Sequence, residues 1–272
     1  MARLDFLLSD DVIAFYWMGF LLADGTFSHY DKQSGLATSL HAELSIHDLP
    51  HLEKLASLLE VEIKHLKPRT ESYSESTQLV YIGKADKKII PLICHKFDIK
   101  QQKTYNPPDF SKYQFSNDQI LSLIIGYIDG DGCISMISPA PNLKYIIRIN
   151  THISWKHNLL FINNFIHKKY NCLQTNNVNT TKRGFTDLSI SKQKLLKYMK
   201  HFIEQNNLPV LSRKWDVLTS LDYASINQQQ TTYTSKACKP VTINNMTFNS
   251  ISEAARYFNC TNPTIKRMCK IN

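Results

Sequence analysis

The sequence predicts an α+β protein made of two similar halves, each with the order α-β-β-α-β-β-α, followed by a small helix-turn-helix unit. The first observation is a motif that occurs twice, as FYWMGFLLADGTF at residues 15–27 and as LIIGYIDGDGCI at residues 123–134. The second is that apolar and polar residues alternate after each copy, which is typical of a strand with one buried face. The third is a pair of short helical segments near the end of the chain.

The order of elements is the same in both halves. Each motif is predicted to form an apolar helix, and aligning the glycines places Asp24 opposite Asp131. An internal repeat of this kind should be sought before any single motif is interpreted. We therefore assign residues 1–113 to the first repeat and residues 114–224 to the second. In both, the helix is followed by an alternating strand (36–47 and 144–153), a helix (49–59 and 158–169), a strand-rich stretch (61–83 and 173–190) and a last helix (85–97 and 192–205).

The end of the chain has a different composition. Residues 225–238 are polar and include three consecutive glutamines, which predicts a linker. Residues 239–272 follow as a separate unit, with a hairpin at 241–248 and a capping-box pattern of Ser250 and Glu253 opening a helix to 258. A second helix is expected from 262 to 270. Because this helix is basic, the unit has the layout of a helix-turn-helix DNA-binding module.

Composition indicates which kind of molecule the protein binds. Lys and Arg total 32 against 23 Asp and Glu, a net charge of +9, and hydrophobic residues make up 43%. This profile excludes a mainly disordered or fibrous chain and favours a polyanionic partner, either nucleic acid or an acidic membrane surface. The apolar run 12–23 is shorter than the roughly 20 residues that span a bilayer and lacks a signal-peptide pattern. We expect no membrane partner and an intracellular location, in the cytoplasm of a bacterial or phage host or in a eukaryotic organelle.

The cysteines indicate neither a metal site nor a disulfide framework. There are six, no two form a CxxC pair, and none has zinc-ligand spacing with a histidine. Reduced thiols are therefore expected.

Small residues recur within each motif helix at a spacing of four. Gly19 and Ala23 form one pair, and Gly126 and Gly130 form the other. Residues four apart lie on one helix face, and small side chains there allow two helix backbones to approach closely. We therefore predict that the two motif helices pack against each other along a pseudo-two-fold axis.

That packing brings Asp24 and Asp131 to the same end of the helix pair. Gly25 and Gly132 follow them and are predicted to be left-handed C-caps. Two carboxylates at helix C-termini repel each other and interact unfavourably with the helix dipoles. A divalent metal such as Mg²⁺, with water and phosphate oxygens as further ligands, would offset that repulsion. Paired acids, a metal and a basic surface together suggest hydrolysis of two phosphodiesters, one on each strand of a duplex.

The segments WMGFLLADG and IIGYIDGDG resemble the LAGLIDADG motif of homing endonucleases, and the doubled motif resembles the single-chain members of that family. The resemblance implies sheets that form a saddle over double-stranded DNA, a monomer, and a metal-dependent staggered double-strand cut at a long asymmetric target. It also implies that Asp24 and Asp131 bind the metal, Mg²⁺ or another divalent cation such as Mn²⁺, or Ca²⁺ in a non-cleaving state. Ala23 and Gly130 are included in that metal site.

The resemblance has one departure within the motif. Leu22 stands where the motif has its earlier acid, which the second copy keeps as Asp129. That position is not the metal ligand in the family. The terminal unit, through FNSISEAARYF and the basic helix, resembles the small modules appended to intron-encoded nucleases.

The family also carries a basic residue near each active site. This resemblance points to Lys103 in QQKTY and Lys214 in SRKWD, with Lys100 and Arg213 as alternatives. A cation there could stabilise charge in the transition state or orient the attacking water.

DNA contacts are expected from the polar faces of the long strands and from the basic terminal helix. Arg, Asn and His side chains suit the base edges of the major groove, which a β-ribbon can enter. The resemblance also implies that the residues at the ends of the long strands hold water near the metal, and by position these are His47 and Lys156. The full predicted set is His41, Glu43, His47, Lys144, Arg148, Asn150, His152, Lys156, Arg183, Lys266, Arg267 and Lys270.

Two alternatives to a site-specific endonuclease remain open. One is a maturase, an RNA-binding splicing factor on the same fold whose partner would be its own intron RNA. The other is a DNA-binding regulator that does not cleave. Asp24 and Asp131 are both present, which favours the nuclease.

Overall fold

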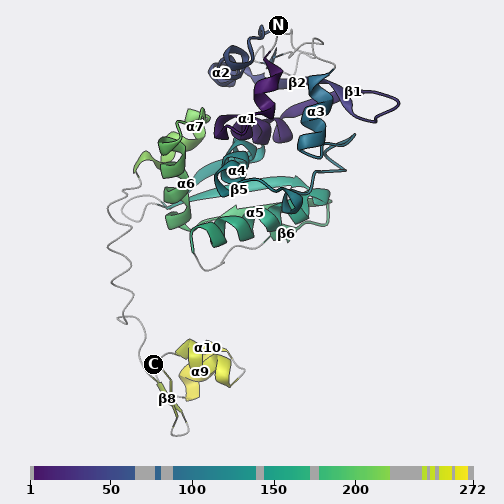
Figure 1. Cartoon of the computed structure of the whole chain (residues 1–272). Helices are drawn as coiled ribbons and strands as arrows, with labels where there is room; N and C mark the ends of the chain where they lie inside the picture. Colours follow the sequence, from purple (N-terminus) through teal and green to yellow (C-terminus); the bar gives the residue numbers. More distant parts are fainter. Residues whose placement is uncertain are drawn as a thin grey trace. The chain divides into compact units, whose positions relative to one another are not determined.

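The structure is a computed structural model that describes residues 3–64, 77–80, 88–138, 144–171, 178–220, 241–243, 246–248, 251–258 and 261–268. The chain divides into two compact units, Met1–Leu221 and Asp222–Asn272, and both are drawn in Figure 1. In the described parts, no helix has the length and apolar character needed to cross a membrane.

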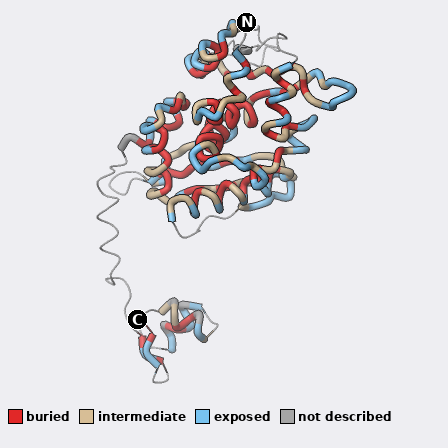
Figure 2. Tube along the Cα trace, viewed as in Figure 1, coloured by how far each residue is buried: buried red, intermediate tan, exposed pale blue. Residues whose placement is uncertain are grey.

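Two motif helices, α1 (Val12–Ala23) and α4 (Asn117–Asp131), form the centre of the larger unit. The Asp11 side chain caps α1 by accepting a hydrogen bond from the Ile13 amide at 2.7 Å. At α4, Ser116 and Gln119 form a reciprocal capping box. Both helices are buried along most of their length, as the red central segments of Figure 2 show. An apolar helix buried on all sides is the structure that the sequence predicts.

The first repeat surrounds α1 with an antiparallel sheet and two helices. Its sheet has the order β1-β2-β3. The predicted strand-rich stretch 61–83 contains β3, and apart from β3 only residues 61–64 of it are described. The elements are η1 (Leu4–Leu8), β1 (Gly25–Tyr30), β2 (Ala37–Ser45), η2 (Ile46–Asp48), α2 (Leu49–Leu59), β3 (Thr77–Val80) and α3 (Ile89–Lys96).

The second repeat follows the predicted order throughout. Its antiparallel sheet has the order β4-β5-β7-β6. Helices α5 and α6 pack against strands β7 and β5 respectively. The elements are η3 (Phe110–Lys112), β4 (Gly132–Ser138), β5 (Lys144–His152), η4 (Ile153–Trp155), α5 (Lys156–Lys169), β6 (Val178–Thr180), β7 (Phe185–Ile190), α6 (Gln193–Gln205), α7 (Ser212–Trp215) and η5 (Asp216–Ser220).

The predicted alternation holds better in β5 than in β2. In β5, Ile147 and Ile149 are fully buried while Arg148 is exposed. In β2, the alternation places Ala37 and Ser39 on the same face as His41, which should be the polar face, yet both are buried. The reason is that α3 packs against β2, so this part of the sheet is covered on both sides.

The smaller unit contains a two-stranded sheet and two helices around its own core. The predicted hairpin and both predicted helices are present as β8 (Val241–Ile243), β9 (Met246–Phe248), α9 (Ile251–Tyr257) and α10 (Asn262–Met268). The predicted linker, Ser250 and Lys270 lie outside the described residues. The core consists of Val241, Ile243, Phe248, Ala254, Ala255 and Ile265.

Candidate functional site

The site begins with the close approach of α1 and α4. A Cβ atom added to Gly19 would lie 1.9 Å from the carbonyl oxygen of Leu123, and one added to Gly126 would lie 1.9 Å from that of Tyr16. No side chain fits in either place, so the backbones of the two helices touch. The predicted contact through small residues is confirmed, and it is nearly symmetric between the repeats.

The same contact continues to the helix ends, where the two acids lie. Asp24 is the C-cap of α1 and Asp131 is the last residue of α4. A Cβ at Gly130 would lie 2.3 Å from the Ala23 Cβ and 3.4 Å from the carboxyl carbon of Asp24. Ala23 and Gly130 therefore act as spacers that let the two acidic ends meet.

The glycines after the acids have a different role from the one predicted. Among the described glycines, only Gly35 and Gly184 have positive φ, so Gly25 and Gly132 are not left-handed caps. The chain instead runs directly from each helix into a strand, β1 or β4. A Cβ at Gly25 would meet the Leu21 carbonyl oxygen at 2.4 Å, and one at Gly132 would meet that of Ile128 at 2.5 Å. Glycine is required here by close packing on the preceding helix turn.

Both carboxyls are harder to ionise than an isolated aspartate. Desolvation and then the charge of Asp131 raise the pKa of Asp24 to about 6, while Lys214 and Lys103 oppose the rise. Asp131 keeps a solvent-exposed side, yet desolvation by the surrounding protein raises its pKa as well. Two acids whose pKa values are raised in this way would be stabilised in their ionised form by a bound cation.

A lysine reaches the end of each motif helix. The Lys103 ammonium donates hydrogen bonds to the carbonyl oxygens of Leu22 at 2.7 Å and Ala23 at 2.9 Å. The buried Lys214 donates to the carbonyls of Ile128 at 3.2 Å, Gly130 at 3.2 Å and Gly132 at 2.7 Å, and also to that of Asp129. Each lysine thus binds carbonyls at the end of its motif helix, where the last carbonyls lack helical partners.

The position of these lysines affects their own ionisation. Desolvation lowers the pKa of Lys103 to about 8, although Asp131 and Asp24 favour its charged form. Desolvation also lowers the pKa of Lys214. The two alternatives lie elsewhere: exposed Lys100 pairs with Asp98 at 3.3 Å, and Arg213 pairs with Asp48. The structure therefore brings Lys103 and Lys214 to the acids, as the resemblance implies.

Asp24 and Asp131 suit a hard divalent cation. Carboxylate oxygens are the donors that Mg²⁺ prefers, and Mg²⁺ usually keeps several waters and takes further ligands from phosphate. Within the part of the chain that the structure describes, no group of three or more His, Cys, Asp or Glu side chains could hold a metal. The donor set thus fits a metal shared between two acids, water and a phosphate, and it does not fit a closed structural site.

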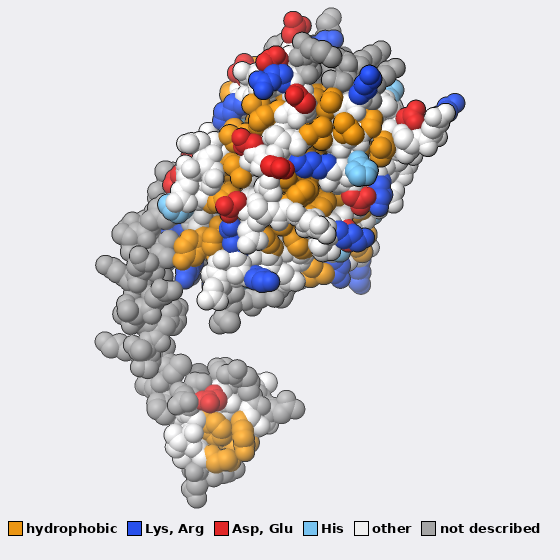
Figure 3. All heavy atoms as spheres, in the orientation of Figure 1, with side chains coloured by type: hydrophobic (Ala, Val, Ile, Leu, Met, Phe, Trp, Pro, Cys, Tyr) orange, Lys and Arg blue, Asp and Glu red, His pale blue; other side chains and the backbone are white. Residues whose placement is uncertain are grey.

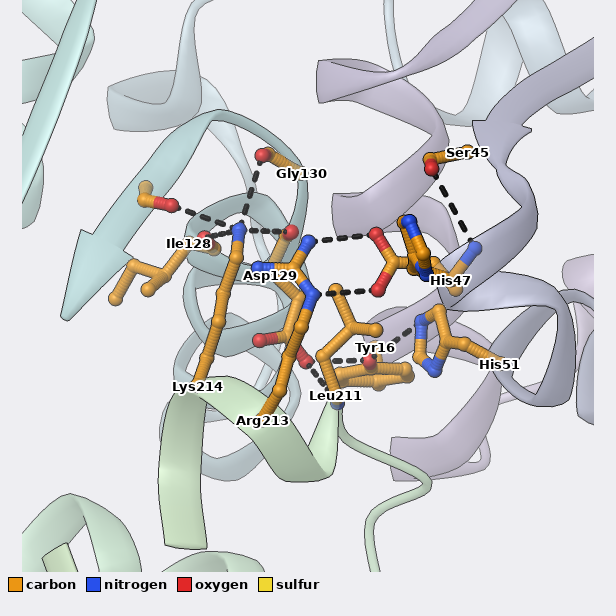
Figure 4. A network of polar contacts seen from close by, with 12 residues as sticks. Tyr16, Ser45, His47, His51, Ile128, Asp129, Gly130, Leu211, Arg213 and Lys214 are labelled. Atoms are coloured by element: carbon orange, nitrogen blue, oxygen red, sulfur yellow. Dashed lines mark hydrogen bonds and ion pairs between the residues drawn. The ribbon is translucent and has the colours of Figure 1, made fainter. Parts of the chain in front are cut away.

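Asp129 has a different function from its neighbour Asp131. It is 1% exposed, and its carboxylate accepts hydrogen bonds from the Tyr16 hydroxyl at 2.6 Å, the Leu211 amide at 3.0 Å and the Trp215 indole at 2.6 Å. Burial raises its pKa to about 6, and these hydrogen bonds oppose the rise. Figure 4 shows Asp129 with Tyr16 and Leu211, beside Lys214 and Arg213.

An ion pair between Asp48 and Arg213 joins the two repeats next to this network. Asp48, 6% exposed, accepts hydrogen bonds from Arg213 at 2.5 and 2.6 Å. The pair lowers the pKa of Asp48 and raises that of Arg213. Arg213 therefore holds α7 against η2 at the end of β2.

The predicted DNA-contacting residues of the second repeat lie mostly on an exposed sheet face. Lys144, Arg148 and Asn150 are exposed along β5, and half-buried His152 packs edge-on against the Tyr105 ring. Arg183 is exposed in a surface hollow of about 480 Å³. The other residues that line this hollow are Asn150, Thr181, Lys182 and Phe185.

In the first repeat, His41 and Glu43 are half-buried on β2, and His47 is exposed in η2. Lys156 is exposed but is not the counterpart of His47. It begins α5, whereas Ser154 occupies the middle of η4 as His47 does of η2. The pairing of His47 with Lys156 is therefore corrected.

The C-terminal candidates can be placed only in part. Arg267 is exposed on α10, while the side chain of Lys266 lies outside the described residues, as does Lys270. On the face of the molecule in Figure 3, Lys and Arg side chains are interspersed with acidic and apolar ones.

Comparisons with known proteins relate two parts of the chain to known families. The profile of the LAGLIDADG endonuclease family matches residues 124–223, which include the second motif and Lys214. The similarity to LAGLIDADG endonucleases thus covers the second repeat. The NUMOD1 domain profile matches residues 231–268, within the smaller unit. A search of curated proteins found no match.

Solved structures share the fold over most of the chain. A crystal structure of the meganuclease I-SmaMI bound to uncleaveable DNA with a TTCT central four has a TM-score of 0.50 and 14% identity, over 79% of this chain and 91% of that one. A lysine-to-alanine mutant of I-SmaMI has a TM-score of 0.50 and 13% identity, over 79% and 92% of the two chains. At these identities the likeness shows the fold alone, an α+β arrangement with antiparallel sheets.

Within the larger unit, sequence reasoning missed the roles of Asp129, Tyr16 and Asp48. A signal was present for Asp129, because an acid inside an otherwise apolar helix must find buried donors. Tyr16 gives a similar signal in the first motif. No comparable signal exists for Asp48, whose partner Arg213 lies far away in the chain.

Proposed function

We propose that the protein is a site-specific endonuclease that uses a divalent metal to make a staggered double-strand cut at a long asymmetric DNA target. The observation that carries the proposal is the meeting of Asp24 and Asp131, one from each repeat, at the touching ends of α1 and α4. Each repeat adds a lysine beside its own helix end. One chain thus supplies both halves of the site, which supports action as a monomer.

Asp24 and Asp131 are the residues that would hold the cation, with Mg²⁺ as the proposed ion. When bound, the cation would supply Lewis-acid stabilisation of the phosphate and a water of lowered pKa. The ammonium groups of Lys103 and Lys214 stand close enough to both acids to contribute positive charge where negative charge develops on the phosphate. Since each repeat has its own lysine, each is proposed to serve one strand of the duplex.

The exposed face of β5 is proposed to contact the DNA. Arg148 and Asn150 project from alternate positions of the strand, and Arg183 and Lys182 line the hollow beside them. Arg and Asn side chains can read base edges in the major groove, while lysines contact phosphates. The I-SmaMI structure, described as bound to uncleaveable DNA, supports the proposed DNA partner.

The presence of both acids favours this function over a DNA-binding regulator that does not cleave. The combination with a NUMOD1 domain is consistent with an intron-encoded enzyme. Such an enzyme would act inside the cell, in the cytoplasm of a bacterial or phage host or in a eukaryotic organelle. A maturase role, with intron RNA as partner, is the second hypothesis, and a splicing assay on that RNA would test it.

The experiment is a cleavage selection from a randomised DNA library with Mg²⁺, followed by assays of the selected target. Asp24→Asn and Asp131→Asn should each abolish double-strand cleavage, because the acids hold the cation. Both should bind the target nearly as well as the natural protein, since affinity comes mainly from phosphate contacts elsewhere. Asp5→Asn, an exposed acid in η1, is the matched control and should cut at the normal rate. Full-rate cutting by either site variant would contradict the proposal.

A further inference from the structure

Lys214 is fixed by residues on both sides of it in the chain. The Leu211 amide and the Trp215 indole both donate hydrogen bonds to the carboxylate of Asp129, at 3.0 and 2.6 Å. These two donors lie on either side of Lys214, at the start and the end of α7 (Ser212–Trp215). The segment that carries the lysine is therefore attached to one buried carboxylate.

The ammonium of Lys214 is attached to the same residue. It donates a hydrogen bond to the backbone carbonyl of Asp129 and to the carbonyls of its neighbours in α4. Asp129 thus holds the side chain of Lys214 through its main chain and the backbone around Lys214 through its carboxylate. This closed set of contacts leaves the ammonium little freedom to move.

The first repeat lacks this arrangement. Leu22 occupies the motif position of Asp129 and is itself buried, and its side chain cannot accept a hydrogen bond. Thr104 follows Lys103 where Trp215 follows Lys214. The Lys103 ammonium bonds to the carbonyls of Leu22 and Ala23, but no buried carboxylate at this motif position can hold its segment.

We infer that Asp129 is a positioning residue for Lys214. The lysine of the second repeat is therefore held by a buried carboxylate, whereas Lys103 of the first repeat has none at the matching motif position. The inference rests on the proposed nuclease function. Loosening the contacts that Leu211 and Trp215 make with the Asp129 carboxylate should slow cleavage of only the strand that depends on Lys214. Loosening contacts elsewhere in the core should affect both strands alike or neither.

Strand-resolved cleavage of the selected target tests this directly. Lys214→Met first identifies the strand that depends on Lys214. Trp215→Phe removes the indole donor and keeps a ring in the core, while Asp129→Asn keeps the volume and disturbs the acceptor. Each should slow single-turnover cleavage of that strand, by up to about 100-fold, since a misplacement of about 1 Å can cost that much. DNA affinity and the rate on the other strand should stay unchanged.

Tyr16→Phe is the matched control. It removes a hydrogen bond to the same carboxylate, at 2.6 Å, but from α1 and not from the segment that carries Lys214. Both strands should therefore be cut at their normal relative rates. All variants are compared at a temperature where circular dichroism shows them folded.

A second measurement needs no DNA. Lys214 is 7% exposed, so its amine should react slowly with an acetylating reagent, as mass spectrometry can follow. Trp215→Phe should accelerate labelling of Lys214 relative to Lys103, whereas Tyr16→Phe should not. Global loosening would accelerate both lysines together.

Three results would overturn the inference. The first is normal cleavage of both strands by Trp215→Phe and Asp129→Asn. The second is equal slowing of both strands in these variants, together with labelling of Lys214 that is no faster relative to Lys103 than in the natural protein. The third is a Lys214→Met variant that slows neither strand, which would also remove Lys214 from the proposed function. If Lys214→Met slows one strand and the Asp129 and Trp215 variants do not, the nuclease function stands and only the positioning role fails.

Discussion

Adding a single methyl group between α1 and α4 should destabilise the protein strongly. In Gly19→Ala, the new Cβ would lie 1.9 Å from the Leu123 carbonyl oxygen, 2.7 Å from its carbonyl carbon and 2.9 Å from the Tyr127 nitrogen. All three are backbone atoms, so no side chain can rotate away. The helices must separate by about 1 Å for this contact to become tolerable, which weakens dispersion contacts along the whole buried pair.

The cost can be worked out from that separation. Overpacking of a well-packed core costs about 1–3 kcal/mol, and the rigid backbone contact places Gly19→Ala near 3 kcal/mol. For a unit of this size each kcal/mol lowers Tm by about 2–4 °C, so Tm should fall by about 6–12 °C. Gly126→Ala should cost about the same, because its Cβ meets the Tyr16 carbonyl oxygen at the same 1.9 Å.

The assay is thermal and denaturant unfolding of both single variants and of the double variant. The double variant should cost less than the sum of the two, because one separation of the helices relieves both contacts. Gly184→Ala is the control: its Cβ meets open space but its φ is +79°, so only about 1–2 kcal/mol of backbone strain is expected. If both core variants melt within about 2 °C of the natural protein, the helices do not meet at these glycines.

Three further predictions concern the site and the C-terminal unit. Because the pKa of Asp24 is raised from 3.8 to about 6, its ionised form is disfavoured in the folded protein. Asp24→Asn should therefore stabilise the protein by up to about 3 kcal/mol at pH 7.5, and unfolding curves should show this gain disappearing as the pH falls from about 6 to about 4. Arg213→Ala should lower the free energy of unfolding by about 1–2 kcal/mol, because it leaves buried Asp48 unpaired. Denaturant unfolding should show a smaller loss at acid pH, where Asp48 is protonated, and Arg213→Lys should restore little, since lysine cannot bind both carboxylate oxygens. Deleting residues 239–272 should weaken DNA binding, make its salt dependence shallower and shorten the footprint at one end, while saturating enzyme still cleaves the same phosphodiesters. A footprint of unchanged length would mean that this unit does not contact DNA.

The sequence alone was sufficient for the features that depend on local pattern. Period-two alternation indicated β2 and β5, and the doubled motif indicated α1 and α4 as well as the approach of Asp24 to Asp131. Small residues at a spacing of four were enough to predict the helix contact, because α-helix geometry places such residues on one face. These inferences succeeded because each depends on geometry within one element or on a repeat visible in one dimension.

Only the tertiary structure decided how the chain surrounds the two acids. The family resemblance pointed to Lys103 and Lys214, but the carbonyls that they contact became known only from the packed helix ends. The link from Asp129 to Tyr16 and Trp215 joins residues far apart in the chain, and so does the pair Asp48–Arg213. The buried start of β2 depends on where α3 packs. Contacts between distant segments follow from the packing of whole elements, which no local pattern in the sequence encodes.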